Sequence, residues 1–425
     1  MIFQKSDRFC KAQSVAFILK FSFINDIIHN KTQKEPIMPE LSDRTANFTD
    51  SVIRRMTRIS NQYGAVNLSQ GFPDFEPPQE ILQRLAEVSK EDVHQYSITW
   101  GAQNFREALA AKITHFSGIS VDPNKELVVT CGSTEAMMAA MMSVTNPGDK
   151  VIVFSPFYEN YGADTILSGA EPIYVSLVPP KFDFDPNVLE DAFRQKPKAI
   201  ILCNPSNPCG KVFTRDELNI IAGLAKKYDS FVITDEVYEH ILYKPNVHTY
   251  MASLPGMKDR TITCNSLSKT YSITGWRLGY TMANEDITDR IKKVHDFLTV
   301  GAAAPLQEAA VTGLKFGDSY YKDLQEKYTH KRDLFLRGLD DIGLPHTVPE
   351  GAYYIMIDIS EFGYASDLEF AEVLARDVGV GAVPGSSFFR EDEHRYIRLH
   401  FAKKDETLNE ALNRLSLIRR KIKYR

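Results

Sequence analysis

The sequence predicts an α/β protein with a central sheet that is mostly parallel. Short apolar runs rich in β-branched residues alternate with amphipathic helical segments through the middle of the 425-residue chain. This alternation is typical of a parallel sheet that helices cover on both faces. Polar residues of unusual type follow several of the runs. Because ligands of such sheets bind at the carboxyl ends of the strands, the pattern also predicts where the functional residues gather.

The predicted elements follow one another along the chain. Strands are expected at residues 126–130 (ELVVT), 150–154, 199–203 (AIILC), 230–234 (SFVIT) and 260–265. Helices are expected at residues 134–144 (TEAMMAAMMSV) and 215–227. The strand segments are short and β-branched, whereas the helical segments are longer.

Composition argues against several classes of function. An apolar fraction of 43% and a charged fraction of 25% are ordinary for a globular protein. The net charge of −5 gives no reason to expect a nucleic-acid partner. The five cysteines lack CxxC spacing and the ten histidines lack an HExxH pair, so we expect neither a disulfide framework nor a metal site. Scattered cysteines also indicate a reducing compartment, which we take to be the cytoplasm.

The first 37 residues differ from the rest, with six basic residues against three acidic ones. The apolar run at 15–24 is too short for a membrane span, and no other stretch approaches one. A charged segment before the run hints at a secretory signal, but no small-residue cleavage site follows it. Asp7 and Asp26 weaken the alternative of a transit peptide. We expect residues 1–44 to be an extension outside the folded core.

Lys269 is the most informative single residue. It follows the predicted strand 260–265 within the segment SLSKTY, and Arg277 comes eight positions later. A lysine amine can form a Schiff base with an aldehyde, while hydroxyls and a guanidinium can hold a phosphate. Pyridoxal 5′-phosphate (PLP) carries both groups. An isolated lysine after a strand would more often be merely solvated.

Gly132, Ser133 and Thr134 stand between a predicted strand and a predicted helix. Gly132 permits a tight turn, and the next two residues offer hydroxyls and free N–H groups at a helix N-terminus. This arrangement can bind a phosphate. An ordinary helix N-cap is an equally good explanation of the segment alone.

The loop NPSNPCG at 204–210 directly follows the run AIILC. Its prolines and glycine restrict the backbone and should aim two asparagine amides, those of Asn204 and Asn207, from the strand end. A rigid amide suits a phenolate oxygen on a cofactor. The alternative is a turn in which the asparagines cap their own backbone.

Asp235 and Tyr238 follow the run SFVIT. A carboxylate at the buried end of a strand is costly without a cationic partner, and a protonated pyridine nitrogen would be such a partner. Tyr238 could then donate to the ring oxygen. An aspartate that caps the following helix is the commoner explanation of the motif alone. The aromatic segment SPFYENY at 155–161 is open to two explanations, either stacking on a planar cofactor or packing beneath a loop.

Together with NLSQGFPD at 67–74 and YIRL at 396–399, these segments resemble the class I/II aminotransferases of PLP fold type I. The pattern is most similar to the subgroup of kynurenine, glutamine and methionine aminotransferases, over about residues 45–420. The resemblance implies a homodimer with a shared active site. It also implies a large PLP-binding domain over 81–310 and a smaller α+β domain built from 45–80 and 311–425, joined by a long helix from about Pro305.

The resemblance assigns roles around the cofactor. Lys269 would form the Schiff base with PLP and carry the proton, and Asp235 would pair with the pyridinium. Asn207 and Tyr238 would contact the ring oxygen, and Tyr158 would stack on the ring. The phosphate would be held by Gly132, Ser133, Thr134, Ser266, Arg277 and, from the other subunit, Tyr96.

The resemblance also assigns the substrate side. Arg398 would grip the α-carboxylate, with Asn207 beside it, and Gly71 would belong to a loop that closes over the substrate. An aromatic wall of the kynurenine-type enzymes falls at Ile53, and a histidine from the neighbouring subunit falls near Ala303. Both positions would offer an uncharged wall without a group for a distal carboxylate, so we expect neutral L-amino acids as donors.

The resemblance implies a ping-pong transfer of an amino group from an L-amino acid to a 2-oxo acid. A PLP-dependent β-lyase acting on cysteine conjugates would use the same residues and is the alternative enzyme. A catalytically silent PLP-fold module, such as the sensing half of a transcription regulator, is the alternative of another class. The presence of Lys269, Asp235 and Arg398 weighs against that second alternative.

Overall fold

The computed structural model describes residues 41–46 and 50–425. The predictions for the extension 1–37 therefore lie outside the described residues. A short helical turn at Asp43–Thr45 belongs to a separate unit, and the main folded unit covers Thr49–Arg425. Every helix among the described residues is too short or too polar to cross a bilayer.

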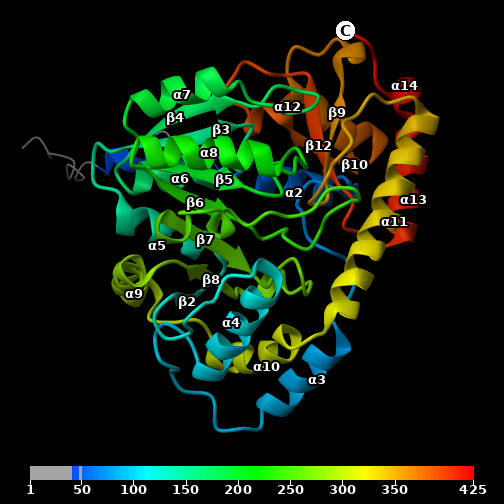
Figure 1. Ribbon diagram of the computed structural model, residues 1–425. Helices are drawn as coiled ribbons and strands as arrows, with labels where there is room; N and C mark the ends of the chain where they lie inside the picture. The colour runs from blue at the N-terminus through cyan, green and yellow to red at the C-terminus, as the bar shows by residue number, and fades with distance from the viewer. Residues whose placement is uncertain (1–40, 47–49) are drawn as a thin grey trace, which may run out of the picture. The chain divides into compact units, whose positions relative to one another are not determined.

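A seven-stranded sheet forms the centre of the fold (Figure 1). Its strand order is β2-β8-β7-β6-β5-β3-β4. The strands are β2 (Leu127–Thr130), β3 (Lys150–Ser155), β4 (Glu171–Ser176), β5 (Ala199–Cys203), β6 (Phe231–Asp235), β7 (Thr261–Ser266) and β8 (Gly279–Met282). The five strands expected from the sequence are all present, with bounds that differ by one residue at most.

The α/β class with a mostly parallel sheet is confirmed. Strands β4, β3, β5, β6 and β7 pair in parallel, whereas β8 pairs antiparallel with both β7 and β2. The sequence analysis missed β8 and β4. Strand β8 has only four residues and begins with a glycine, and β4 is only partly buried, so neither gives a strong apolar signal.

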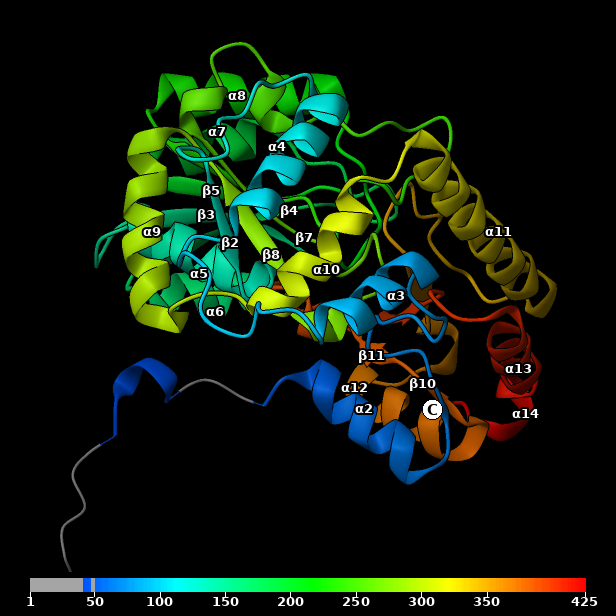
Figure 2. The ribbon, with the colours of Figure 1, turned by 90° about the horizontal axis from the view of Figure 1, so that it is seen from below.

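Helices cover both faces of this sheet, as Figures 1 and 2 show. One face packs against α5 (Ser133–Val144), α6 (Asn160–Leu167) and α9 (Glu285–Thr299). The other packs against α4 (Gln103–Ser117), α7 (Pro186–Arg194), α8 (Arg215–Lys227) and α10 (Ala304–Leu314). Because both faces are buried, strands such as β5 are apolar along their whole length.

Elements from both ends of the chain form a second group. Strands β9 (Tyr354–Asp358), β11 (Val383–Pro384) and β12 (Tyr396–His400) make a three-stranded sheet, and β1 (Val66–Asn67) pairs with β10 (Val380–Gly381). The associated helices are α2 (Val52–Gln62), α11 (Asp318–Ile342), α12 (Asp367–Val373), α13 (Asp405–Leu415) and α14 (Ile418–Lys421). Helix α3 (Gln79–Val88) packs instead against α10 beside the central sheet. The domain boundaries given above remain predictions.

The long helix expected from about Pro305 is two helices. Helix α10 ends at Leu314, and α11 begins at Asp318 after Gly317, whose extended backbone cannot continue a helix. The ring of Phe316 in this break packs against Tyr320 and Tyr271. The break therefore places a partly buried aromatic side chain against the core beside α10.

The register of the central strands positions the candidate site. Cys203 at the end of β5 pairs with Asp235 at the end of β6, and Asp235 pairs with Cys264 on β7. These neighbouring parallel strands end at the same edge of the sheet. The loops that carry Asn207, Tyr238 and Lys269 therefore leave the sheet side by side.

Candidate active site

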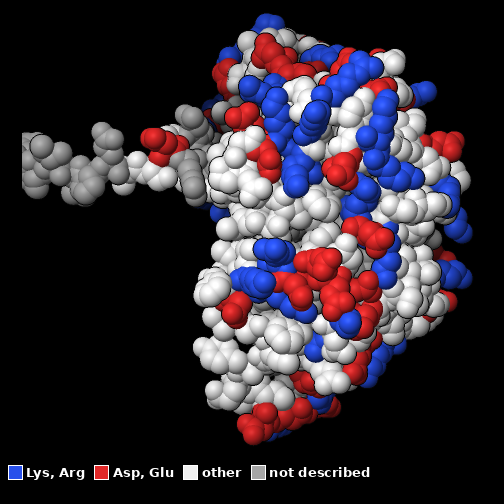
Figure 3. Space-filling view, turned by 60° about the vertical axis from the view of Figure 1, so that its left-hand side comes forward, with Lys and Arg blue, Asp and Glu red and all other residues white. Residues whose placement is uncertain are grey.

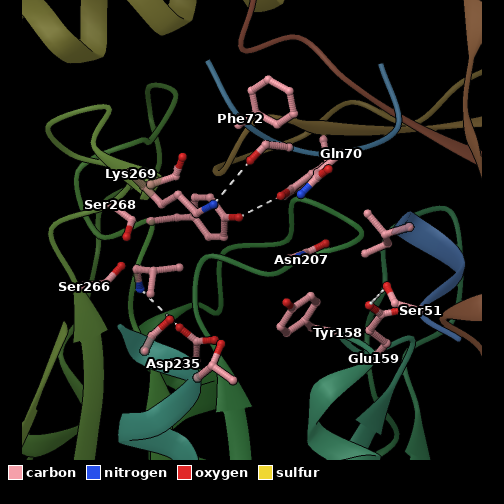
Figure 4. Close-up of a pocket in the computed structure, with 18 of the residues that line it drawn as sticks. Ser51, Gln70, Phe72, Tyr158, Glu159, Asn207, Asp235, Ser266, Ser268 and Lys269 are labelled. Atoms are coloured by element: carbon pink, nitrogen blue, oxygen red, sulfur yellow. Dashed lines mark hydrogen bonds between the residues drawn. The ribbon is translucent and has the colours of Figure 1, made fainter. Parts of the chain in front are cut away.

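A cavity of about 460 Å³ lies at this edge of the central sheet (Figure 4). Lys269, Ser268 and Ser266 stand on one side of it, and Ser51 and Glu159 stand on the other. Twelve residues predicted from the sequence line the cavity: Ile53, Gly71, Ser133, Thr134, Tyr158, Asn207, Asp235, Tyr238, Ser266, Lys269, Arg277 and Arg398.

Lys269 is a partly buried amine just after β7. Its Nζ donates a hydrogen bond to the carbonyl oxygen of Gly71 at 3.3 Å and lies 5.8 Å from the centre of the Tyr238 ring. Burial lowers the pKa of Lys269 to about 8, although the charge of Asp235 opposes this shift. A lysine with such a pKa has a substantial neutral, nucleophilic fraction near neutral pH.

Asp235 is the buried acidic group of the cavity. Its carboxylate accepts hydrogen bonds from the Tyr161 hydroxyl at 2.6 Å and from the Val237 N–H at 3.4 Å. Burial nevertheless raises the pKa of Asp235, which means that the protein alone stabilises its negative charge incompletely. A cation bound beside this carboxylate would remove that deficit.

Hydroxyl groups without partners mark a second part of the cavity. The Oγ atoms of Ser266 and Ser268 are buried and have no hydrogen-bond partner among the described residues. The N-terminus of α5 opens nearby with Ser133 and Thr134, and no side chain caps it. Free N–H groups at a helix N-terminus together with hydroxyl donors suit a bound phosphate.

Gly132 and Arg277 complete the part of the cavity that suits a phosphate. A Cβ atom added to Gly132 would stand 2.3 Å from a terminal guanidinium nitrogen of Arg277, so only glycine lets the two residues meet. Arg277 itself adopts a left-handed backbone with φ of 55°, which is unfavourable for a side chain of its kind. Such strain is found at sites where a side chain must be aimed.

Arg398 on β12 is buried and holds Asn207 in one orientation. Its guanidinium donates to Asn207 Oδ1 at 2.7 Å and to the Ser69 carbonyl oxygen at 2.8 Å. Because the amide oxygen of Asn207 is engaged in this way, its NH₂ group is left to donate to a ligand. The Arg398 Nε also lacks a partner among the described residues.

The prediction that two asparagine amides face the site is wrong for Asn204. Its Oδ1 accepts from the backbone N–H of Phe213 at 3.1 Å, so this amide holds the loop in shape. Asn207 alone of the pair lines the cavity.

Tyr354 is a site residue that the sequence analysis missed. Its hydroxyl is 2.8 Å from the Tyr238 hydroxyl, and the centre of its ring lies 4.3 Å from the Arg398 guanidinium. The ring of Phe388 also contacts this guanidinium, at 4.5 Å. The only signal in the sequence was the pair Tyr353-Tyr354 directly after Gly351-Ala352 at the start of a strand.

The outer end of the cavity combines apolar and charged groups. Ile53 lines it, as expected, with Tyr158. The expectation of a wholly uncharged wall is wrong, because Arg54 and Glu159 line the same end. The Ser51 hydroxyl donates to Glu159, whereas the Arg54 side chain forms no ion pair within the described chain.

Two predicted residues lie away from the cavity. Tyr96 is 86% exposed, and Ala303 is exposed at the start of α10. Both were assigned to the site of a neighbouring subunit, and those assignments remain predictions.

The residues of the cavity fit PLP. Unpartnered hydroxyls, an uncapped helix and Arg277 match a phosphate, the buried Asp235 matches a protonated ring nitrogen, and Lys269 matches an aldehyde. No one of these features identifies the cofactor, but PLP carries all three complementary groups.

Comparison with known proteins agrees with this chemistry. A sequence model of aminotransferase class I and II matches residues 63–415. The methionine aminotransferase of Escherichia coli K12 is 34% identical over 89% of this chain and 98% of its own. Human kynurenine–oxoglutarate transaminase 3 is 32% identical over 87% of this chain and 88% of its own.

A solved structure shows the same fold. The N-succinyldiaminopimelate aminotransferase of Mycobacterium tuberculosis superposes with a TM-score of 0.86 at 33% identity, over 89% of this chain and all of that one. The relatives are aminotransferases, so the β-lyase alternative is not favoured. This chain therefore belongs to the class I and II aminotransferase family, whose PLP-dependent members transfer an amino group between an amino acid and a 2-oxo acid.

Proposed function

We propose that this aminotransferase takes its amino group from a neutral L-amino acid, by a ping-pong mechanism in which Lys269 is the Schiff-base lysine. The observation that carries the proposal is the placement of the Lys269 amine, with its lowered pKa, in one cavity with Asp235 and Arg398. When bound, PLP supplies an aldehyde for condensation with amines and a protonated ring that accepts electrons from the substrate Cα.

The residues that would hold the cofactor follow from their free groups. Ser133, Thr134, Ser266 and Arg277, with Gly132 beneath Arg277, provide the donors for the phosphate. Asp235 would balance the ring nitrogen. The NH₂ group of Asn207 and the hydroxyl of Tyr238 can both donate to the ring oxygen, and Tyr158 supplies an aromatic face.

Lys269 is the candidate for proton transfer at the substrate Cα. Near pH 7 an amine of pKa about 8 is neutral in about a tenth of molecules, whereas an unperturbed lysine is neutral in fewer than about one in a thousand. A neutral Nζ can take the Cα proton and return it. Arg398 can meanwhile hold the α-carboxylate through donors that its protein partners leave free.

The apolar residues at the outer end of the cavity fit a neutral donor, whereas the arginine at the same end fits an acidic acceptor. Ile53 and Tyr158 give an uncharged surface for the donor side chain. Arg54, at the outer end and without an ion pair within the described chain, can pair with the distal carboxylate of 2-oxoglutarate. The human relative is a kynurenine–oxoglutarate transaminase by name, which supports this choice of acceptor.

A homodimer in the cytoplasm is part of the proposal. Tyr96, Ile98, Phe297 and Val300 are large apolar side chains that are between 47% and 90% exposed. The segment around Thr99 touches the end of α9 through His295, so these side chains belong to one region. The face drawn in Figure 3 carries uncharged surface between its charged clusters. An exposed apolar region of this kind is suited to burial against a second copy of the chain.

Free cysteines at positions 131, 203, 209 and 264 support a reducing compartment.

The substitution Lys269→Ala tests the proposed function. We expect it to abolish transfer from methionine to 2-oxoglutarate while the protein stays folded, because the lysine acts in the chemistry and not in the core. Lys327→Ala is the matched control, since burial also lowers the pKa of Lys327 to about 8 but this residue lines a different cavity. Substantial transfer by the Lys269→Ala protein would refute the assignment.

A further inference from the structure

Tyr354 lies where the substrate side and the cofactor side of the cavity meet. It begins β9 and pairs across the sheet with His400, two positions beyond Arg398 on β12. Residues two positions apart on a strand share a face, so Tyr354 and Arg398 are diagonal neighbours on one face of this small sheet.

The contacts of Tyr354 reach both sides. The centre of its ring lies 4.3 Å from the guanidinium carbon of Arg398, and its hydroxyl is 2.8 Å from the Tyr238 hydroxyl. A Cβ atom added to Gly71 would stand 2.3 Å from the Tyr354 hydroxyl, so the loop over the cavity rests on the same group. Tyr354 is only 3% exposed, which fixes all three contacts.

The direction of the hydrogen bond between the two hydroxyls follows from the role proposed for Tyr238, and their surroundings are compatible with it. Burial raises the pKa of Tyr354, but the positive charge of Arg398 counteracts that shift. Burial and the neighbouring tyrosines raise the pKa of Tyr238 well above its usual value. Either hydroxyl could donate across this contact. When the single proton of Tyr238 is donated to the cofactor ring oxygen, as proposed above, Tyr354 is the donor between the two hydroxyls. The Tyr238 proton is then free to point into the cavity.

Several other groups act on this pair. Lys269 lies 5.8 Å from the Tyr238 ring, and Tyr353 packs edge-on against it at 5.1 Å. Cys203 acts on both tyrosine hydroxyls, and Glu159 and Tyr158 act on Arg398. Tyr328 and His400 also interact with Tyr354 and Arg398, respectively. Arg398 is the cation nearest to Tyr354, because its guanidinium lies on the ring.

We propose that Tyr354 is a positioning residue for amino transfer. Its hydroxyl donates to the Tyr238 hydroxyl and so directs the Tyr238 proton toward the cofactor. Because its ring lies against Arg398, the strength of the hydrogen bond between the two hydroxyls depends on whether a carboxylate is bound to Arg398. The inference rests on the roles proposed above for Tyr238 and Arg398. A carboxylate bound to Arg398 cancels part of its charge. Tyr354 then becomes a weaker donor, and the Tyr238 hydroxyl changes the strength of its own bond into the cavity.

The test is a pH titration of the absorbance of the PLP-loaded dimer, with and without 4-methylpentanoate. This carboxylate has the skeleton of a neutral amino acid but no amino group to transfer. We expect the pH midpoint of the wild-type absorbance titration to shift when the carboxylate binds. In Tyr354→Phe the midpoint of the free enzyme should move by about 0.5–1 pH unit, the size of one neutral hydrogen bond, and the response to the carboxylate should fall by at least about half.

Two further variants separate this role from general packing. Tyr353→Phe removes the neighbouring hydroxyl, which donates to the Gly71 carbonyl oxygen at 2.9 Å, and should keep the wild-type response. In a Tyr238→Phe background, adding Tyr354→Phe should produce no further shift, because the proposed effect passes through Tyr238.

Three results would overturn the inference. The first is a titration midpoint and carboxylate response in Tyr354→Phe equal to those of the wild type, and the second is a loss of carboxylate response in Tyr353→Phe as large as that in Tyr354→Phe. The third is a midpoint shift on adding Tyr354→Phe to Tyr238→Phe that is as large as the shift in the wild-type background. If Tyr354→Phe does not fold, the single variant Tyr238→Phe decides. Loss of its carboxylate response supports the role of Tyr354, and an unchanged response overturns it. Activity retained by Lys269→Ala would remove the proposed function itself, whereas a wild-type titration in Tyr354→Phe removes only this inference.

Discussion

Replacing Arg398 by lysine tests the substrate side of the site most directly. Arg398 is 1% exposed, and its guanidinium makes two hydrogen bonds to the protein, to Asn207 at 2.7 Å and to Ser69 at 2.8 Å. Its donors beyond these two bonds are available to a substrate carboxylate. A lysine keeps the charge but presents one ammonium group, which cannot serve Asn207, Ser69 and a two-point carboxylate contact together.

The expected loss can be worked out from these contacts. At least one charge-assisted hydrogen bond to the carboxylate disappears, which costs about 1.5–3 kcal/mol in the transition state. This corresponds to a decrease of about 10- to 100-fold in kcat/KM. The contact of the cation with the rings of Tyr354 and Phe388 weakens too, so the decrease in kcat/KM should lie toward the upper end of this range. Leaving Asn207 or Ser69 unsatisfied should lower the stability by about 1–3 kcal/mol.

The assay is kcat/KM for methionine, glutamine, phenylalanine and aspartate, each with 2-oxoglutarate. All donors share the α-carboxylate, so Arg398→Lys should reduce every value by a similar factor. Arg395→Lys is the matched control, because Arg395 lies three positions before Arg398, is exposed and pairs with Glu393. A loss confined to one donor would refute the role of Arg398. Aspartate as the best donor would refute the proposed preference for neutral side chains.

Four further predictions concern the rest of the chain. Because the pKa of Lys269 is about 8 and the neutral amine is the reactive form, PLP uptake by the apo-protein should accelerate as the pH rises to about 8 and then level off; a rise that continues to about pH 10 would contradict this. Tyr96→Phe should weaken PLP retention in a dimer, and a fully active monomer in sedimentation runs at assay concentration would exclude the shared site. Arg54→Gln should raise KM for 2-oxoglutarate about tenfold with little effect on pyruvate, and equal effects on both acceptors would exclude a distal-carboxylate contact. A chain that begins at Met38 should keep the kcat and melting temperature of the full chain, and a large loss of either would show that residues 1–37 contribute to the fold.

The sequence by itself determined the α/β class and most of the cavity. Asn207, Asp235 and Lys269 each lie within four residues of the end of a buried parallel strand. Local chain order therefore places them at the carboxyl edge of the sheet, whichever strands turn out to be neighbours. Residue types that carry specific chemistry, a lysine beside hydroxyls and an aspartate at a buried strand end, then identified the kind of ligand.

Only the tertiary structure decided how the two ends of the chain complete the site. Tyr354 and Tyr238 are 116 positions apart and meet because the small sheet packs against the loop after β6. Arg54 enters the cavity because α2 lies beside it, and nothing in the periodicity of that helix distinguishes this arginine from Arg55 or Arg58. The Oδ1 of Asn204 turns inward to the Phe213 N–H, although its motif equals that of Asn207. Contacts between distant segments depend on packing, which local patterns do not contain.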